Sequence, residues 1–328
     1  MTGSAECPMP SEVAEMKKPK ALAQTPEPLK YLTLDEFWRA KPQFIVGPLI
    51  VGALIRAVWE LPAAKAYFER NNMEMLGFWT ALHYTAFALV LSFAFHGFVV
   101  VYRGYMEDGH KVQPDKELWT SPAAAATRSS SVIMSELVYS ALPVLPVSSS
   151  WVHFLAALVG FAVVWDALFF VGHGVMHKFP TLYKNFHKTH HTIKDPNCFG
   201  AYFVTYQSHL ILEQLVVIAC CATFVPRDVL MFTLYTGTFG TFSQHAGFEM
   251  GHLKVPFTPI TLDHILTALS FYALPLGGMT TTHHDWHHEK FNNNYALSFT
   301  YLDRLFGTLQ EGRPTGEAQV KMKAGKAQ

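Results

Sequence analysis

The sequence predicts an all-α membrane protein, a multi-pass bundle of about four spanning helices arranged as two hairpins. Half of its 328 residues are hydrophobic and only 15% are charged, which is a composition typical of membrane proteins. Several apolar stretches are long enough to cross a hydrocarbon core of about 30 Å. Nine of the seventeen histidines fall in three groups near the ends of these stretches, so we also expect a histidine-rich metal site on one membrane face.

Two apolar stretches open the predicted bundle. Residues 44–61 carry Arg56 close to their end, where an arginine side chain can extend to the interface. Residues 77–102 contain 26 positions with one near-continuous apolar run. At about 1.5 Å per residue, this run crosses the bilayer with some tilt. Both stretches are predicted to be transmembrane helices.

The two predicted hairpins follow. Residues 132–147 and 151–172 are separated by prolines and serines, which favour a turn between antiparallel helices. Residues 209–225 and 229–242 are joined by a short polar turn of proline, arginine and aspartate. Residues 257–279 are apolar but interrupted by prolines and glycines, so we interpret them as re-entrant or interfacial.

The chain divides into four predicted parts. Residues 1–42 are polar and lack the apolar region of a cleaved signal peptide, which predicts a disordered cytosolic tail. Residues 43–150 contain the N-terminal transmembrane helices, and residues 151–310 form the domain that bears the histidine clusters. Residues 311–328 form a polar C-terminal tail.

Charge predicts the orientation. Lysine and arginine are frequent in the N-terminal tail, after the second apolar stretch and in residues 178–194, and cytosolic loops carry such an excess. Counting passes from a cytosolic N-terminus then places every histidine cluster on the cytosolic side. The formal net charge is zero, so we expect no nucleic-acid partner. Four cysteines without a C-x-x-C spacing predict neither a disulfide framework nor a thiolate zinc site.

Three histidine strings predict a metal centre. They are "HGVMH", "HKTHH" and "HDWHH", and they supply His173, His177, His187, His190, His191, His284, His287 and His288. Residues three and four apart share one face of a helix. Eight imidazoles are too many for one ion and suit two.

The ligand type alone does not identify the metal, so the residues that accompany the histidines must decide. Imidazole binds iron, copper, nickel and zinc alike. A hydrolytic zinc site would need a general base such as the glutamate of H-E-x-x-H, which is absent from the sequence. Two iron ions that activate O2 for attack on a lipid C–H bond give this all-nitrogen site a function. A membrane zinc hydrolase, a metal transporter and a scaffold without catalysis are the alternatives from other classes.

The three strings and their order resemble the fatty acid hydroxylase/sterol desaturase superfamily of membrane diiron oxygenases, whose pattern is H-x-x-x-H, H-x-x-H-H, H-x-x-H-H. Within it, the chain most resembles the C-4 methylsterol monooxygenases, through "HHDWHHEKFNNNYALSFTYLDRLFGT" (283–308), "QHAGFEM" (244–250) and Asp166 seven residues before His173. The stretch "YQSHLILE" keeps the tyrosine, histidine and acid of the family pattern but lacks its proline. Cholesterol 25-hydroxylases have a nearly identical third cluster.

The resemblance implies roles for further residues. His245, between Gln244 and Gly247, is expected to be a ninth ligand beside the eight histidines of the three strings. Residues expected either to bind a metal ion or to orient a ligand imidazole are His209, Glu249, His283, Asp166 and Asp285. Residues that bind the substrate are not identified, although Phe199, Phe203, Phe242 and Phe248 are candidates for lining the entry of a lipid.

The resemblance also implies the reaction. It implies two iron ions (Fe2+/Fe3+), O2, and NAD(P)H-derived electrons that arrive through cytochrome b5 or its reductase at the cytosolic face of the endoplasmic reticulum membrane. The substrate implied is a membrane lipid, with C-4 methyl oxidation of a sterol as the first expectation. Sterol C-5 desaturation, sterol 25-hydroxylation and fatty acid hydroxylation are alternatives within the superfamily. The oligomeric state is left open.

Overall fold

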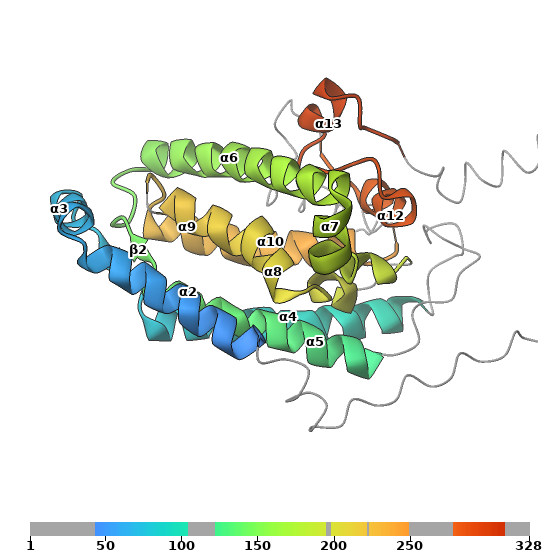
Figure 1. Ribbon diagram of the computed structural model, residues 1–328, viewed down its shortest axis with the longest axis horizontal. Coiled ribbons are helices and arrows are strands. Elements are labelled where there is room, and N and C mark those ends of the chain that lie inside the picture. Colours follow the sequence, from blue (N-terminus) through green and yellow to red (C-terminus); the bar gives the residue numbers. More distant parts are fainter. Residues whose placement is uncertain (1–42, 104–121, 195–197, 222, 249–277, 312–328) are drawn as a thin grey trace, which may run out of the picture.

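A computed structural model describes residues 43–103, 122–194, 198–221, 223–248 and 278–311. These residues are almost entirely helical (Figure 1). One two-residue antiparallel ladder joins β1 (Glu74–Met75) to β2 (Pro143–Val144), with Glu74 opposite Val144. Both predicted tails, apart from Glu311, and all but the last two residues of the predicted interfacial segment 257–279 lie outside the described residues.

In the described part of the N-terminal half, the structure contains four helices and a 3-10 segment. They are α2 (Gln43–Glu60), α3 (Pro62–Arg70), α4 (Phe78–Arg103), α5 (Pro122–Met134) and the 3-10 helix η2 (Ser135–Ala141). Both α2 and α4 contact η2, so that this short segment lies inside the bundle.

The C-terminal half begins with the longest helix, α6 (Trp151–Lys178). Short elements follow it, namely α7 (Pro180–Leu182), the π-helix η3 (Tyr183–His187), and the 3-10 helices η4 (His190–Thr192) and η5 (Cys198–Tyr202). The remaining elements are α8 (Tyr206–His209), the π-helix η6 (Leu210–Gln214), α9 (Leu215–Cys221), α10 (Arg227–Gln244), α12 (Thr281–Lys290) and α13 (Tyr301–Leu305).

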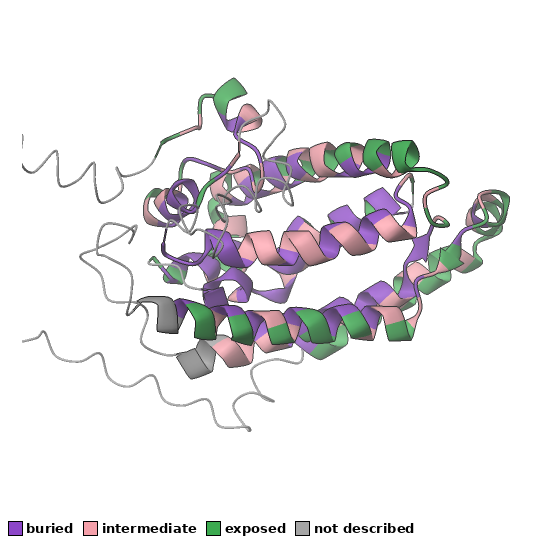
Figure 2. Cartoon of the chain, turned by 180° about the vertical axis from the view of Figure 1, so that it is seen from behind, coloured by how far each residue is buried: buried purple, intermediate pink, exposed green. Residues whose placement is uncertain are grey.

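Helices suited to a membrane are fewer than the sequence predicts. Among the described residues, Phe78–Val99 and Trp151–Lys178 are long and apolar enough to cross a bilayer, and α2 with α3 would add a third span despite an 80° bend between them. The expected number of about four is therefore not confirmed. Outward-facing apolar side chains such as Leu49, Val90 and Val171, each at least 60% exposed, alternate with buried ones along these helices (Figure 2). Such a surface suits lipid better than water.

The first predicted hairpin is wrong in its first half. Helix α5 ends at Met134, the chain continues as 3-10 helix to Ala141, and β2 follows in place of a spanning helix over 132–147. The reason is Pro143: the residue before a proline is disfavoured in the α conformation, and Leu142 has an extended ψ of 130°. Both helices of the second predicted hairpin are present, as α8 to α9 and α10.

Helix α6 connects the core to the histidine clusters. It begins where the Ser150 hydroxyl accepts a hydrogen bond from the backbone N–H of His153, and it ends just before Pro180. Its 28 residues correspond to a length of about 42 Å. Phe161, Phe169 and His173 share one buried stripe, which contacts α9 and α10. The same helix face therefore packs the core and carries His173 near its end.

Two buried carboxylates fix the segment that follows α12. Asp303 accepts from the backbone N–H groups of Tyr295 and Ala296, both at 2.9 Å, and from the hydroxyl of Thr308 at 2.6 Å. Asp166 of α6 accepts from the backbone N–H of Ser298 at 2.7 Å. The segment is thus tied to α6 and to α13 on either side.

Replacing the Asp303 carboxylate is expected to destabilise the protein. The substitution Asp303→Ala leaves two backbone N–H groups without their acceptor in a fully buried position, and we expect a loss of roughly 3–5 kcal/mol in the free energy of unfolding. Thermal unfolding in detergent micelles measures this loss. Arg304→Gln, at the neighbouring exposed position, is the control. Equal stability of the two variants would contradict the role of Asp303.

Candidate metal centre

The nine histidines predicted as ligands lie together in two adjacent groups. In each group, one ligand atom from every residue lies within 4.8 Å of all the others. The first group, the five-histidine group, contains His173, His177, His187, His191 and His287, and the second, the four-histidine group, contains His190, His245, His284 and His288. Their elements meet at one end of the bundle (Figure 1). The structure thus brings together residues that are up to 115 positions apart in the sequence.

Each H-x-x-H-H string contributes to both groups. His187 and His191 enter the five-histidine group and His190 the other, whereas His284 and His288 enter the four-histidine group and His287 the first. Successive residues of a helix point about 100° apart. The middle histidine of each string, His190 or His287, therefore points away from the first and last histidines, which are four residues apart. Each string therefore supplies ligands to two groups. The sequence analysis had predicted one shared helical face for its three histidines.

The second string does not form a regular α-helix. His187 ends the π-helix η3, and His190 and His191 begin the 3-10 helix η4. The third string lies on α12, which starts at a capping box between Thr280 and His283 and ends at Phe291 in the left-handed conformation (φ 67°). This short helix buries all three of its ligand candidates.

Backbone carbonyl groups orient four of the rings. Nδ1 of His173 lies 2.7 Å from the carbonyl oxygen of Tyr295, and Nδ1 of His287 lies 2.6 Å from that of Asn293. His245 pairs in the same way with Thr241 at 2.8 Å, and His288 with Ile193 at 2.9 Å. Because a carbonyl oxygen only accepts, each ring carries its proton on Nδ1 and leaves a lone pair on Nε2.

The free lone pairs face one another, which favours a cation between them. Nε2 of His284 lies 2.9 Å from Nε2 of His245 and 3.1 Å from Nε2 of His288. A single proton on His284 could satisfy only one of these two acceptors. Nitrogens bound to one ion at about 2.1 Å lie about 3 Å apart, so the spacing and the donor set fit a metal ion. The same holds for His191, at 3.1 Å from His177 and 3.2 Å from His287.

Burial keeps these imidazoles neutral. Burial first, and then the neighbouring imidazoles, hold the pKa values of His187, His191 and His284 well below the ordinary value. Burial lowers the pKa of His245 to about 4. Neutral imidazole is the form that binds metal, so both groups offer lone pairs at neutral pH.

The other predicted site residues lie outside the two groups. His283 belongs to the α12 cap, and its Nε2 lies 3.3 Å from the Glu311 carboxylate. Asp166 fixes the backbone at Ser298, and Asp285 is buried on α12. Glu249 lies outside the described residues.

His209 belongs to a third, separate cluster. Its two ring nitrogens lie 3.7 Å from Glu136 and 3.5 Å from Glu213. Glu136 was missed by the sequence analysis because it lies in η2, outside every histidine string. The signal that could have found it is a lone acid between the apolar residues of "VIMSELVY", since a buried carboxylate requires partners.

A cavity opens beside both groups. It is lined by His173 and His187 of the five-histidine group, by His190, His245 and His284 of the other, and by His209 and Glu213. The apolar part of its wall includes Phe169, Leu212 and Leu297. The cavity therefore contacts both histidine groups and two members of the third cluster.

Comparison with known proteins agrees with this site. Residues 157–308 match the model of the fatty acid hydroxylase family. This part of the chain is similar to that family. The match includes all nine histidines of the two groups and leaves out α2, α4, α5 and η2. The predicted resemblance is confirmed for the fatty acid hydroxylase segment.

Curated relatives of this segment carry two kinds of name. The chain is 31% identical over 148 residues to the cholesterol 25-hydroxylase-like protein of Danio rerio, covering 45% of this chain and 53% of the relative. It is 31% identical over 159 residues to methylsterol monooxygenase 1 of Gallus gallus, covering 48% and 47%. Identity to cholesterol 25-hydroxylase of Mus musculus is 28% over 154 residues, covering 45% of each chain. The chain spans about half the length of these relatives, and no solved structure matches it.

Metal removal provides a test of the site that does not require activity. We expect a chelator to lower the Tm of the purified protein, because an ion that binds only the folded state at one hundred times its Kd stabilises it by about 2.7 kcal/mol. Readdition of Fe2+ should restore the Tm. Mg2+, which prefers oxygen ligands, is the control and should not. An unchanged Tm after complete removal of metal would contradict a metal centre at the two histidine groups.

Proposed function

We propose that this protein is a membrane-bound non-haem diiron oxygenase that hydroxylates an unactivated C–H bond of a lipid, with O2 as the oxidant. The observation that carries the proposal is the pair of adjacent histidine groups, with five and four converging imidazoles. One metal ion in each group would account for all nine residues. The family match supports the same reaction class.

Two iron ions bound there would supply the activation of O2, with one oxygen atom entering the substrate and the other leaving as water. The chain itself supplies position and surroundings. The carbonyl groups of Tyr295 and Asn293 hold the imidazole tautomers, and Asp303 holds the Tyr295 backbone in place. Eight of the nine histidines are buried, which excludes bulk water from the reaction.

We further propose the C-4 methyl group of a sterol as the site of oxidation, with electrons from NAD(P)H through cytochrome b5 at the cytosolic face of the endoplasmic reticulum. The relative from Gallus gallus named methylsterol monooxygenase supports this substrate. The relatives named cholesterol 25-hydroxylase support hydroxylation of a sterol side chain as the second candidate. Both candidates take a sterol from the membrane.

Metal content tests the diiron proposal. Protein prepared under reducing, iron-replete conditions should hold two iron ions per chain, one for each group. His173→Ala and His284→Ala, one from each group, should each lose about one ion and abolish lipid hydroxylation. His153→Ala, an exposed histidine on the same α6 helix as His173, should change neither. One retained zinc ion and no iron would argue for a hydrolase instead.

Sterol profiling tests the substrate. In yeast lacking its C-4 methylsterol oxidase, expression of this chain should reduce the accumulated 4,4-dimethylsterols, while the His284→Ala variant should not. Accumulation that is the same with both proteins would reject C-4 oxidation. The appearance of a side-chain hydroxysterol would favour the second candidate.

A further inference from the structure

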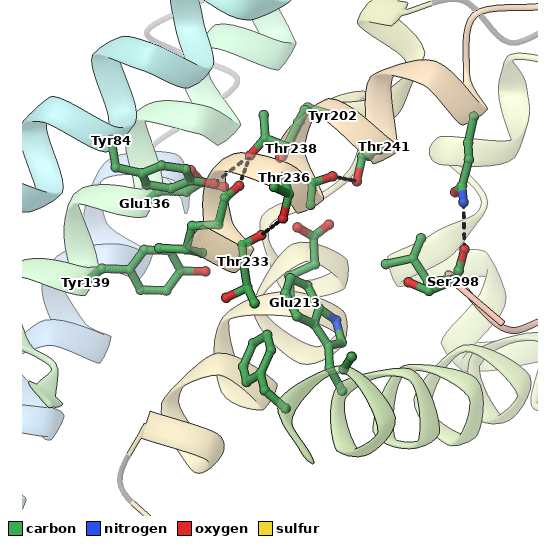
Figure 3. Close-up of a pocket in the computed structure, with 18 of the residues that line it drawn as sticks. Tyr84, Glu136, Tyr139, Tyr202, Glu213, Thr233, Thr236, Thr238, Thr241 and Ser298 are labelled. Carbon is green, nitrogen blue, oxygen red and sulfur yellow. Dashed lines mark hydrogen bonds between the residues drawn. The ribbon is translucent and has the colours of Figure 1, made fainter. Parts of the chain in front are cut away.

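A second cavity lies inside the bundle and borders the one beside the histidine groups. Its wall comes from α4, η2, α6 and α10 and from the segment after α12 (Figure 3). Glu213, Thr241 and Leu297 line both cavities. The two spaces are therefore neighbours that share one boundary, and a ligand in the interior cavity would have one end close to the histidine groups.

The interior cavity combines an apolar wall with a polar one. Phe161, Trp165 and Phe299 provide hydrocarbon contact, whereas Tyr84, Tyr139 and several threonines of α10 provide hydroxyl groups. Figure 3 shows the carboxyl groups of Glu136 and Glu213 reaching into this space. A site for a small ion alone would not need the aromatic wall, which suits the rings or chain of a lipid.

A buried cluster of one histidine and two glutamates lies where the two cavities meet. Glu136, His209 and Glu213 place two carboxylates around one imidazole, at 3.7 and 3.5 Å from its nitrogens. Glu136 and His209 are each only 1% exposed, and Glu136 Oε2 and both ring nitrogens of His209 have no hydrogen-bond partner. A buried oxygen without a partner is costly, so Glu136 Oε2 favours a ligand whose hydroxyl group can form a hydrogen bond with it.

We propose that the Glu136–His209–Glu213 cluster binds the hydroxyl group of a sterol whose rings occupy the interior cavity. This inference rests on the proposed function and specifies how the substrate is held. Glu136 lines the interior cavity, His209 lines the cavity beside the histidine groups, and Glu213 lines both, so the hydroxyl end of the sterol lies next to the metal centre. The carbons presented for oxidation are those adjacent to the hydroxyl-bearing carbon.

This placement separates the two candidate reactions. In a 4-methylsterol, the C-4 methyl group is attached to the ring carbon beside the one that carries the hydroxyl. The side-chain carbon that a 25-hydroxylase attacks lies at the opposite end of a rigid ring system. A hydroxyl bound beside the metal centre therefore favours C-4 methyl oxidation over side-chain hydroxylation.

Binding to the full-length, metal-loaded protein in the absence of O2 tests the inference. The probes are 4,4-dimethyl-5α-cholestan-3β-ol and its 3-methyl ether, which keeps the shape but cannot donate, and their equilibrium binding is measured with protein in lipid nanodiscs. Wild-type protein should bind the alcohol at least about tenfold more tightly, as expected for one buried hydrogen bond. The Glu136→Gln and Glu213→Gln variants should each reduce this preference, and their combination should reduce it to within about threefold.

Asp228→Asn is the matched control. It makes the same carboxylate-to-amide change on α10 at a residue that caps Ser148 through a 3.0 Å hydrogen bond and lines neither cavity. Its preference for the alcohol should equal that of the wild type. Since the Glu213 side chain is 23% exposed, Glu213→Gln provides a second variant if Glu136→Gln does not fold.

Three outcomes would overturn the inference. They are equal binding of alcohol and ether by the wild type, binding of neither, and a third metal ion per chain that is lost in Glu136→Gln, which would assign the cluster to a cation. Failure of the proposed function gives a different result, since O2 consumption with the alcohol would then be absent although the preference for the alcohol remains.

Discussion

The arrangement of the site depends on one constraint, the mutual repulsion of imidazole lone pairs in a buried space. Carbonyl groups of Tyr295, Asn293, Thr241 and Ile193 fix the proton on the outer nitrogen of four rings, so the inner nitrogens can only accept. Inner nitrogens about 3 Å apart then require a cation, and without one the surrounding structure must hold them together against repulsion. This accounts for the rigid supports around the site, because Asp303 and Asp166 each anchor backbone near a carbonyl that orients a ring.

Much of this centre was predictable because metal ligation imposes residue type and spacing. The strings at His173, His187 and His284 identified eight residues that the structure brings together, and the resemblance added His245. The resemblance also included Asn294 and Asp303. Asn294 has a positive φ of 51° and links the backbone of His283 to that of Gln310, whereas Asp303 collects the N–H groups of Tyr295 and Ala296. Both residues maintain the shape of the segment that carries the carbonyl groups of Asn293 and Tyr295.

Other features could not be predicted from the sequence because they depend on tertiary packing. Hydrophobicity alone could not distinguish a spanning helix over 132–147 from the 3-10 helix and short strand that form there. Pro143 was the one local signal that a helix would not continue. The partners that orient the rings are mainly backbone carbonyl groups, which leave no mark on residue identity, whereas the expected partners were carboxylates. Glu136 meets His209 only through the packing of η2 against the rest of the bundle. Phe199, Phe203, Phe242 and Phe248 line neither of the two cavities.

The two halves of the chain therefore contribute differently to the chemistry. The family segment, residues 157–308, holds every histidine of the two groups and also His209 and Glu213. Tyr84, Glu136 and Tyr139 come from outside that segment and complete the wall of the interior cavity. Because these residues of α4 and η2 contact the interior cavity together with the matched segment, we expect them to influence which lipid the cavity accepts.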